Sequence, residues 1–380
     1  MIYDSVLVSG HPQQLRIAVL RQGEPLAFFY GSLTSTEPLL DDIYKAKIIN
    51  LTESFVWLDL GSGKTGVMKA RSTPSFQQGQ KIIVQVIREA LEDIAAPSQT
   101  KGVRLSSAIH LAGRYCVYNP QQQGLSFSPS LTAPTRQNLK NLFSTSSSGI
   151  TFRSVCEKEP SADVLQKEIL SLTTLWQTLS NQTSSLSQRL YQAPSILARL
   201  LREAPLGTIF IIDDWNVLQY CQHQSAVYSE QKFSLRMALQ NERPLFEHFG
   251  MEEIWQGLCE KKIPLPGGGN ICIEETACAV TIDINAGNQS GEKVNQAAIP
   301  VILDHIAWRG LSGNIIIDFI ESGSKHKEKL LHLFQKYLQQ KQLKRIKILG
   351  WSPLGFLQLQ SRRQRASLTS EIMKRSFCKD

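Results

Sequence analysis

The six residues Val280-Thr281-Ile282-Asp283-Ile284-Asn285 decide the fold of the C-terminal half of this 380-residue chain. Apolar and polar residues alternate strictly, which is typical of a β-strand with one buried and one open face. Thr281, Asp283 and Asn285 then share the open face. Asp and Asn are poor strand formers, and polar groups inside an apolar strand are costly without a partner. The pattern therefore predicts a strand whose polar face binds something.

A second apolar run, Asn314-Ile315-Ile316-Ile317-Asp318-Phe319-Ile320, carries another single carboxylate. Residues 294–306, between the two runs, have apolar side chains at helical spacing. The order strand, helix, strand predicts a right-handed crossover that joins two parallel strands. Neighbouring strands lie about 4.8 Å apart. We therefore expect Asp283 and Asp318 to meet at the carboxyl ends of neighbouring strands.

Two carboxylates this close repel each other unless they share a proton or bind a hard cation such as Mg²⁺. Mg²⁺ binds through one or two carboxylates, keeps several waters and contacts substrate phosphates, so the pair suits phosphodiester hydrolysis. The structural alternative is that Asp318 caps a turn and Asp283 pairs with a basic residue.

The composition indicates a folded chain with several domains. Hydrophobic residues make up 42% and charged residues 19%, which excludes a disordered chain, and the length predicts roughly two or three domains. The sequence has no long apolar run, its first residues lack the basic start of a signal peptide, and its seven cysteines include no Cys-x-x-Cys pair. We expect a cytoplasmic protein with reduced thiols and no membrane span.

The charge balance favours an anionic partner. Lys and Arg number 41 against 33 Asp and Glu, which gives a net charge of +8. Basic residues concentrate in residues 325–347 and 362–375, where they form either a solvated helix face or a phosphate-binding surface.

Three sequence features that could indicate other functions lack the residues or the geometry that those functions need. Gly61-Ser62-Gly63-Lys64-Thr65 resembles the end of a P-loop, but Leu58 replaces its first Gly and no helix follows, so a turn between strands is expected. Asp213 and Asp214 would point to opposite faces of a strand, which favours a strand end and a helix cap. The histidines stand at no recognised metal-ligand spacing and are expected to be structural.

The N-terminal half is predicted to be mostly β-structure. A hairpin is expected around residues 21–24, and strands at 44–49, 54–60 and 81–86 predict a small β-barrel over residues 36–117. Residues 118–148 are rich in Gln, Ser and Pro, which predicts exposed loops. Helices are expected after Pro160, at 196–201 and at 245–256, with a strand at 207–212.

Segments along nearly the whole chain resemble, in the same order, those of the ribonuclease E/G family. The segments at 281–285 and 313–320 resemble its catalytic segments. The other matching segments are Leu265-Pro266-Gly267-Gly268-Gly269, residues 246–253, Gly355-Phe356-Leu357-Gln358-Leu359, Asp42-Ile43-Tyr44-Lys45-Ala46-Lys47-Ile48, Leu58-Asp59-Leu60-Gly61 and Ser107-Ala108-Ile109-His110-Leu111-Ala112-Gly113-Arg114-Tyr115. This ordered succession is more specific than any single motif.

The resemblance implies an α+β multidomain fold. Residues 1–35 and 206–258 would form an RNase H-like subdomain, and residues 36–117 an inserted OB-fold barrel that binds RNA. Residues 118–205 would form a 5′-sensor region, residues 259–370 a DNase I-like α/β catalytic region, and residues 371–380 a tail.

The resemblance also implies roles for three residues of the catalytic region. Asp283 and Asp318 would hold a catalytic Mg²⁺, which Mn²⁺ could replace, and Asn285 would orient the attack on the phosphate. This agrees with the shared open face of the strand.

Further residues are implied to bind RNA. Gly149-Ile150-Thr151-Phe152-Arg153-Ser154 resembles the family's 5′ sensor, in which Arg153 and the Ser154 hydroxyl would grip a 5′-monophosphate. Trp57 stands where the family has an aromatic residue that stacks on bases, and Lys101 and Arg104 would follow the RNA backbone. Without the family, the cations are ordinary surface charges and Trp57 is a core residue.

The chain departs from the family in several places. Val67 stands where the family has a second stacking aromatic residue, Pro353 replaces a basic residue before Gly355, and the loop after Asn285 is short. The zinc-binding Cys-x-x-Cys would follow Arg365, but only Cys378 occurs there. We therefore expect neither zinc nor the zinc-linked dimer, while a monomer and a differently built homodimer both stay open.

These observations predict a Mg²⁺-dependent endoribonuclease that hydrolyses single-stranded RNA in RNA processing or decay and prefers a 5′-monophosphate end. The alternative is a catalytically weakened paralogue that binds RNA as a regulatory protein. The joint presence of Asp283, Asn285 and Asp318 favours the enzyme, because carboxylates would repel the phosphates that a pure RNA binder holds.

Overall fold

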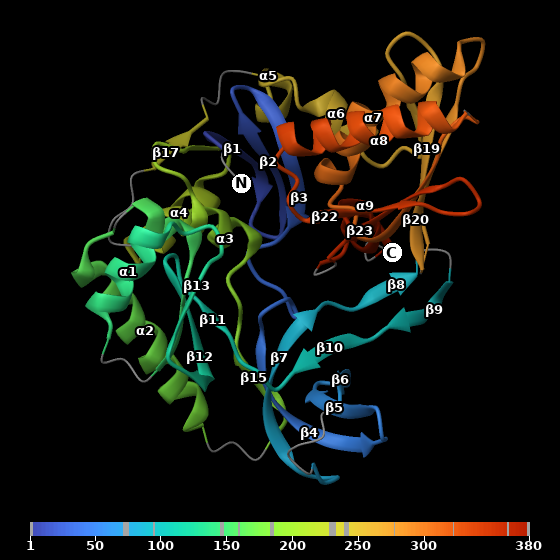
Figure 1. Ribbon diagram of the computed structural model, residues 1–380. Helices are drawn as coiled ribbons and strands as arrows, with labels where there is room; N and C mark the ends of the chain where they lie inside the picture. Colours follow the sequence, from blue (N-terminus) through green and yellow to red (C-terminus); the bar gives the residue numbers. More distant parts are fainter. Residues whose placement is uncertain are drawn as a thin grey trace. The chain divides into compact units, whose positions relative to one another are not determined.

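The protein combines α-helices and β-sheets in two compact units (Figure 1). The computed structural model describes residues 3–70, 76–93, 96–144, 148–158, 160–182, 186–227, 233–238, 243–276, 278–321, 323–362 and 365–377. Unit 1 comprises Met1–Thr34, Glu92–Thr100 and Ser195–Asp380, and unit 2 comprises Ser35–Leu91 and Lys101–Pro194. The finer domain boundaries stay predictions. Within the described residues, no helix is long and apolar enough to span a membrane.

The first sheet of unit 1 has the strand order β17-β16-β1-β2-β3. Its strands are β1 (Ser5–His11), β2 (Gln14–Arg21), β3 (Glu24–Gly31), β16 (Ile209–Ile212) and β17 (Ser234–Met237). The predicted hairpin around residues 21–24 is confirmed by β2 and β3, which pair antiparallel. The predicted strand at 207–212 is confirmed by β16, which pairs parallel with β1.

Apolar side chains cover both faces of this sheet. Val6 and Val8 pack with helices α3 (Ile196–Glu203) and α4 (Trp215–Val227), while Leu7 packs on the opposite face with α5 (Leu245–His248), α6 (Glu252–Gly257) and α9 (Leu368–Phe377). Asp214 accepts a hydrogen bond from the Val217 N–H (2.9 Å) at the start of α4, which confirms the predicted helix cap.

The single helix predicted for residues 245–256 is wrong. The chain forms the two short helices α5 and α6, and Gly250 between them has a left-handed backbone (φ +68°). A helix cannot continue through that conformation, which glycine adopts without a steric penalty. The two short helices bury neighbouring side chains, because Phe246 of α5 and Trp255 of α6 pack together (5.7 Å between ring centroids).

The second sheet of unit 1 has the order β18-β19-β20-β21-β23-β22. Its strands are β18 (Lys262–Pro264), β19 (Asn270–Glu275), β20 (Ala279–Asn285), β21 (Gly313–Asp318), β22 (Ile346–Trp351) and β23 (Leu357–Ser361). Helices α7 (Gly291–Trp308) and α8 (Ser324–Gln340) share its largest apolar core and run beside each other (Figure 1). The predicted crossover is confirmed, because α7 joins the parallel neighbours β20 and β21.

The end of α7 is anchored by a buried polar cluster. Arg309 is 3% exposed and His305 is 6% exposed, and the Arg309 Nε donates to His305 Nδ1 (3.0 Å). Arg309 Nη2 donates to the carbonyl oxygens of Gly257 (3.3 Å) and Glu260 (2.7 Å). His305 must therefore be neutral to accept, and its burial together with the nearby Arg309 charge lowers its pKa to about 3.

We expect this histidine to make the protein less stable below neutral pH. The unfolded chain protonates His305 near pH 6.5 while the folded chain does not, so stability is present above that pH and falls as the pH drops toward 3. At pH 5.5 the loss is about 1.4 kcal/mol. Urea unfolding at pH 7.5 and 5.5 should show this difference in the wild type and a smaller one in His305→Gln. Equal pH dependence in both would contradict the assignment.

Unit 2 contains a closed five-stranded barrel, which confirms the predicted OB-like barrel. Its strands are β4 (Ile43–Leu51), β5 (Phe55–Gly61), β6 (Lys64–Lys69), β10 (Val103–Ser106) and β7 (Lys81–Arg88), and β4 closes the barrel by pairing with both β5 and β7. Strand β15 (Gln188–Tyr191) pairs with the first residues of β4. The two-stranded sheet of β8 (Leu91–Asp93) and β9 (Ala96–Lys101) lies almost entirely in the Glu92–Thr100 segment of unit 1.

The Gly-Ser-Gly segment after β5 is a tight turn into β6, as expected. Gly61, Ser62 and Gly63 all have positive φ angles (+88°, +54° and +73°), which match the turns that favour hairpins. No helix follows, and Lys64 forms an ion pair with Glu37 (2.7 Å). The resemblance to a P-loop therefore has no structural counterpart.

The rest of unit 2 is a four-stranded sheet with two helices. The strands are β11 (Leu111–Ala112), β12 (Cys116–Gln123), β13 (Leu125–Phe127) and β14 (Ser148–Phe152), and the helices are α1 (Ala133–Leu142) and α2 (Ala162–Ser180). The prediction of loops is wrong for most of residues 118–148, which form β12, β13 and α1. Gln121 obscured the strand because its side chain, rather than an apolar one, binds the chain at Ser107 (2.8 Å) and Ile109 (2.9 Å).

Candidate active site

The two carboxylates picked out by the sequence lie side by side. Strands β20 and β21 pair in a parallel register in which Asp283 stands opposite Asp318. Ile282 and Ile317, the residues before them, are buried in the core shared with α7 and α8. Asp283 and Asp318 are both exposed on the other face of the sheet. The predicted juxtaposition at the ends of neighbouring strands is therefore confirmed.

Asn285 joins this pair through a direct contact. It follows Asp283 on the same exposed face of β20, and its Nδ2 donates to Asp283 Oδ2 (2.8 Å). The amide thereby orients one carboxylate and leaves its own carbonyl oxygen on the open face. The partial burial of Asp318 and the negative charge of Asp283 raise the pKa of Asp318 above its usual range. A cation bound between the carboxylates would relieve that repulsion.

A glycine-rich turn stands beside the end of β20. Gly267, Gly268 and Gly269 join β18 to β19 with φ angles of +85°, +106° and +82°. A Cβ atom on Gly269 would lie 2.6 Å from the Asn285 carbonyl oxygen. Only glycine fits this approach at position 269, while Gly267 and Gly268 supply the positive φ angles of the turn.

Asn295 holds the chain next to the site in place. It was not predicted from the sequence. It lies on α7, is fully buried, and makes two hydrogen bonds to one residue: its Nδ2 donates to the Ile320 carbonyl (2.9 Å), and the Ile320 N–H donates to its Oδ1 (3.0 Å). Ile320 is two residues beyond Asp318, so the amide fixes the direction of the chain just after the carboxylate. The only available signal was a polar residue inside the apolar stripe of the helix.

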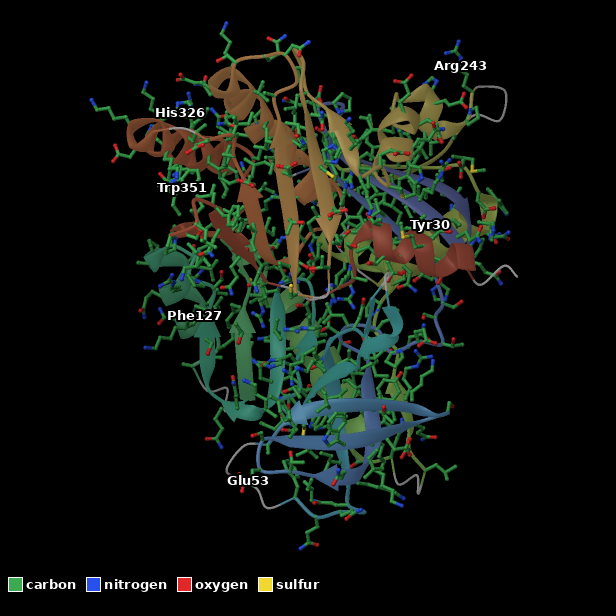
Figure 2. All side chains as sticks on the ribbon, turned by 90° about the vertical axis from the view of Figure 1, so that its right-hand side faces the viewer. Tyr30, Glu53, Phe127, Arg243, His326 and Trp351 are labelled. Atoms are coloured by element: carbon green, nitrogen blue, oxygen red, sulfur yellow. The ribbon has the colours of Figure 1, made fainter. Side chains whose placement is uncertain are left out.

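The amino ends of α7 and α8 are joined near this edge of the sheet. Glu292 at the start of α7 contacts His326 at the start of α8 (3.1 Å). The next residue, Lys327, places its ammonium 5.3 Å from the centre of the Trp351 ring and 3.4 Å from where a Cβ on Gly355 would lie. Figure 2 labels His326 and Trp351. Lys327 therefore places a positive charge at the Gly355 turn, where Pro353 has no charge.

The donor set fits Mg²⁺. Mg²⁺ binds oxygen through one or two carboxylates and completes its shell with water and substrate phosphate. Asp283 and Asp318 provide those two carboxylates.

The residues of the expected 5′ sensor lie in unit 2, where β14 ends. The Arg153 N–H donates to the Tyr115 carbonyl (2.7 Å), and Arg153 Nη1 donates to the Gly113 carbonyl (2.7 Å). Ser154 is exposed and begins a short 3₁₀ helix (Ser154–Lys158). The guanidinium is thus oriented by the backbone of the facing loop, and the next residue in sequence carries an exposed hydroxyl.

Glu168 of α2 holds the same loop from the other side. Its carboxylate accepts the backbone N–H groups of Arg114, Tyr115 and Cys116, each at 2.8 Å. A Cβ on Gly113 would collide with this carboxylate. Glu168 was not predicted from the sequence, because nothing in a helical pattern distinguishes a solvated glutamate from one that binds a distant loop.

The barrel residues expected to bind RNA have different surroundings. Trp57 on β5 is 43% exposed, so the alternative of a core tryptophan is excluded. Arg104 on β10 is half-buried and stacks its guanidinium over the ring of Phe55 (5.5 Å). The side chain of Lys101 lies outside the described residues.

Comparisons with known proteins show which family the chain resembles. The model of the ribonuclease E/G family matches residues 110–365. The chain is 24% identical to ribonuclease G of Salmonella typhimurium over 96% of its own length and 80% of that protein. It is 27% identical to a chloroplastic ribonuclease E/G-like protein of Arabidopsis thaliana (82% of this chain, 33% of that one) and 26% identical to ribonuclease E of a Nostoc strain (80% and 46%).

Proposed function

We propose a specific reaction for this chain, which belongs to the ribonuclease E/G family and is an endoribonuclease. It hydrolyses internal phosphodiester bonds of single-stranded RNA with the help of Mg²⁺, prefers RNA with a 5′-monophosphate, and acts in cytoplasmic RNA processing or decay. In this proposal, the sheet that carries β20 and β21 is the core of the DNase I-like region, and the sheet that carries β1 is the core of the RNase H-like subdomain.

One observation carries the proposal: Asp283 and Asp318 are in register on neighbouring parallel strands and both are exposed. A purely structural role predicts a basic partner for Asp283 or a capped turn for Asp318. Among the described residues, the Asp283 side chain instead contacts Asn285, and the chain after Asp318 is held by Asn295 rather than by the carboxylate. Both carboxylates are therefore available to a ligand.

Each side chain of the site has a separate role in the proposed reaction. Asp283 and Asp318 would hold Mg²⁺, which when bound neutralises charge on the scissile phosphate and lowers the pKa of a bound water. Asn285 keeps the Asp283 carboxylate in place and can present its amide to a phosphate oxygen. Lys327 adds positive charge at the Gly355 turn, where a phosphate of the bound strand is attracted.

The direct test of the reaction compares metal conditions. Purified protein is incubated with an A/U-rich, 5′-monophosphorylated single-stranded RNA in Mg²⁺, in Mn²⁺ and in EDTA. We expect internal cuts with Mg²⁺, support by Mn²⁺, and no cuts in EDTA. Tight binding without cleavage in any metal would favour an RNA-binding protein in place of the enzyme.

The preference for a 5′-monophosphate is tested at Ser154, which follows Arg153 in the sequence. The Arg153 guanidinium is oriented toward the loop by the Gly113 carbonyl, with the Ser154 hydroxyl next in sequence, and a guanidinium with a hydroxyl is a good phosphate-binding pair. We expect Ser154→Ala to reduce the ratio of cleavage rates for 5′-monophosphate over 5′-hydroxyl RNA by about fivefold, since a charge-assisted hydrogen bond contributes about 1 kcal/mol or more.

Ser154 is the better first variant because its side chain is exposed, whereas Arg153 also supports the loop. Ser128→Ala, at a loop serine of the same sheet region, is the matched control and should leave the ratio unchanged. The rate on 5′-hydroxyl RNA should be equal in the wild type and in Ser154→Ala. If both substrates lose activity equally in Ser154→Ala, the hydroxyl does not sense the 5′ end.

A further inference from the structure

We propose that Arg104, held against Phe55, forms a second base-stacking position beside Trp57 on the barrel. This inference rests on the proposed function, because it requires single-stranded RNA on the outer face of the barrel. It assigns Arg104 to base stacking in place of the backbone contact expected from its charge, and it gives Phe55 a supporting role that the sequence patterns did not suggest.

The strand pairing places the three positions in one row. Trp57 on β5 stands opposite Val67 on β6, and Val67 stands opposite Arg104 on β10. Their sequence neighbours point into the barrel, as the buried residues Val56, Leu58, Met68, Val103 and Leu105 show. Trp57, Val67 and Arg104 therefore share the outer face, with Arg104 about 10 Å from Trp57 at a spacing of about 4.8 Å per strand.

The small side chain at Val67 allows Arg104 to reach Phe55. Phe55 precedes Trp57 by two residues and therefore points to the same outer face of β5. Its ring lies diagonally across Val67 from Arg104, and the guanidinium carbon is 5.5 Å from the ring centre. An aromatic ring at position 67 would occupy the space between them. The Arg104–Phe55 contact therefore depends on the small side chain at position 67.

The chemistry of this pair suits a nucleobase. A cation over an aromatic face is held in a restricted orientation, so the guanidinium plane is ordered before RNA binds. Bases stack on arginine planes as well as on aromatic rings. Among the described residues, the structure gives Arg104 no carboxylate partner within ion-pair distance. The guanidinium carbon lies over the Phe55 ring at 5.5 Å from its centre, and the guanidinium plane can stack on a base next to one on Trp57.

Substitution by lysine separates stacking from simple charge. A backbone contact needs only a positive charge, which Arg104→Lys keeps, whereas stacking needs the planar guanidinium. We measure equilibrium binding of the full-length chain to a short single-stranded RNA in EDTA, where cleavage is not expected. The RNA carries 2-aminopurine at successive positions, so that stacking of a base is seen as quenching of its fluorescence.

The inference predicts that Arg104→Lys and Arg104→Gln both weaken binding about tenfold and abolish the quenching at one position, since stacking of one base has an effect of this order. Phe55→Leu should have a similar but smaller effect. Lys69→Gln is the matched control: it removes one exposed cation opposite Phe55 on the same face and should change affinity no more than about twofold, with the quenching retained.

Two failures are distinguishable. If the wild type binds and quenches but Arg104→Lys behaves as the wild type, the stacking role is wrong and the proposed function stands. If the wild type binds no RNA, the proposed function is contradicted, and the inference with it. Thermal unfolding of each variant is followed in parallel. If Phe55→Leu unfolds at a lower temperature than the wild type, the comparison uses only Arg104→Lys and Arg104→Gln.

Discussion

Asp283→Asn and Asp318→Asn should each reduce RNA cleavage by at least about a thousandfold while leaving RNA affinity nearly unchanged. Metal-ion catalysis contributes several kcal/mol to the stabilisation of the transition state, and each 1.36 kcal/mol changes a rate about tenfold. Asparagine keeps the shape of the side chain but removes the charge that attracts Mg²⁺. Since the two carboxylates stand opposite each other in register, the loss of either one removes a ligand from the same Mg²⁺ site.

A matched control comes from the next strand. Glu274 on β19 is an exposed carboxylate that stands opposite Thr281 and pairs with Lys261 (3.2 Å), so Glu274→Gln removes one negative charge from the same sheet but not from the site. We expect it to cleave at the wild-type rate. Single-turnover cleavage and equilibrium binding are measured on the same RNA for all variants. Full activity in either aspartate variant would show that the pair is not the catalytic centre.

Asn295→Leu should lower the free energy of unfolding by about 3 kcal/mol and raise the Mg²⁺ concentration needed for half-maximal cleavage. The substitution leaves the N–H and the carbonyl of the half-buried Ile320 without their partners, and each such group costs about 1–3 kcal/mol when it is desolvated. Because Ile320 follows Asp318 by two residues, the freed chain no longer fixes the carboxylate. Urea unfolding and Mg²⁺ titration of the cleavage rate measure the two effects.

The adjacent Gln296 provides the control for this experiment, because it lies on the same helix and is exposed. Gln296→Leu should change stability by less than about 0.5 kcal/mol and leave the Mg²⁺ dependence unaltered. A destabilised Asn295→Leu protein whose Mg²⁺ dependence equals that of the wild type would restrict Asn295 to a structural role. An unchanged stability would contradict the two hydrogen bonds themselves.

The core of the candidate site could be predicted because strand geometry imposes it. Alternation between Val280 and Asn285 fixes which side chains share a face, and a crossover helix forces the next strand to be parallel. Those two constraints predict that Asp283 and Asp318 lie at the same edge of the sheet, and the structure supplies their register. The closed barrel was predictable for the same reason, since short strands with turn residues between them carry local signals.

The remaining features depend on contacts between residues far apart in sequence. The break between α5 and α6 cannot be seen in the apolar residues, because it depends on the left-handed backbone that Gly250 adopts. Strand β12 was missed because Gln121 uses its polar side chain to bind another part of the chain. Asn295 and Glu168 act on backbone groups of distant loops, and a single sequence contains no mark of such partners.

The most direct test of the central claim is the chemical identity of the RNA fragments formed with and without Mg²⁺. Internally cut RNA is analysed by mass spectrometry after incubation with the wild-type protein in Mg²⁺ or EDTA. If Asp283 and Asp318 hold a metal that promotes attack by water, fragments form only with Mg²⁺ and carry no 2′,3′-cyclic phosphate. Fragments that form equally in EDTA, or that end in cyclic phosphates, would contradict the account.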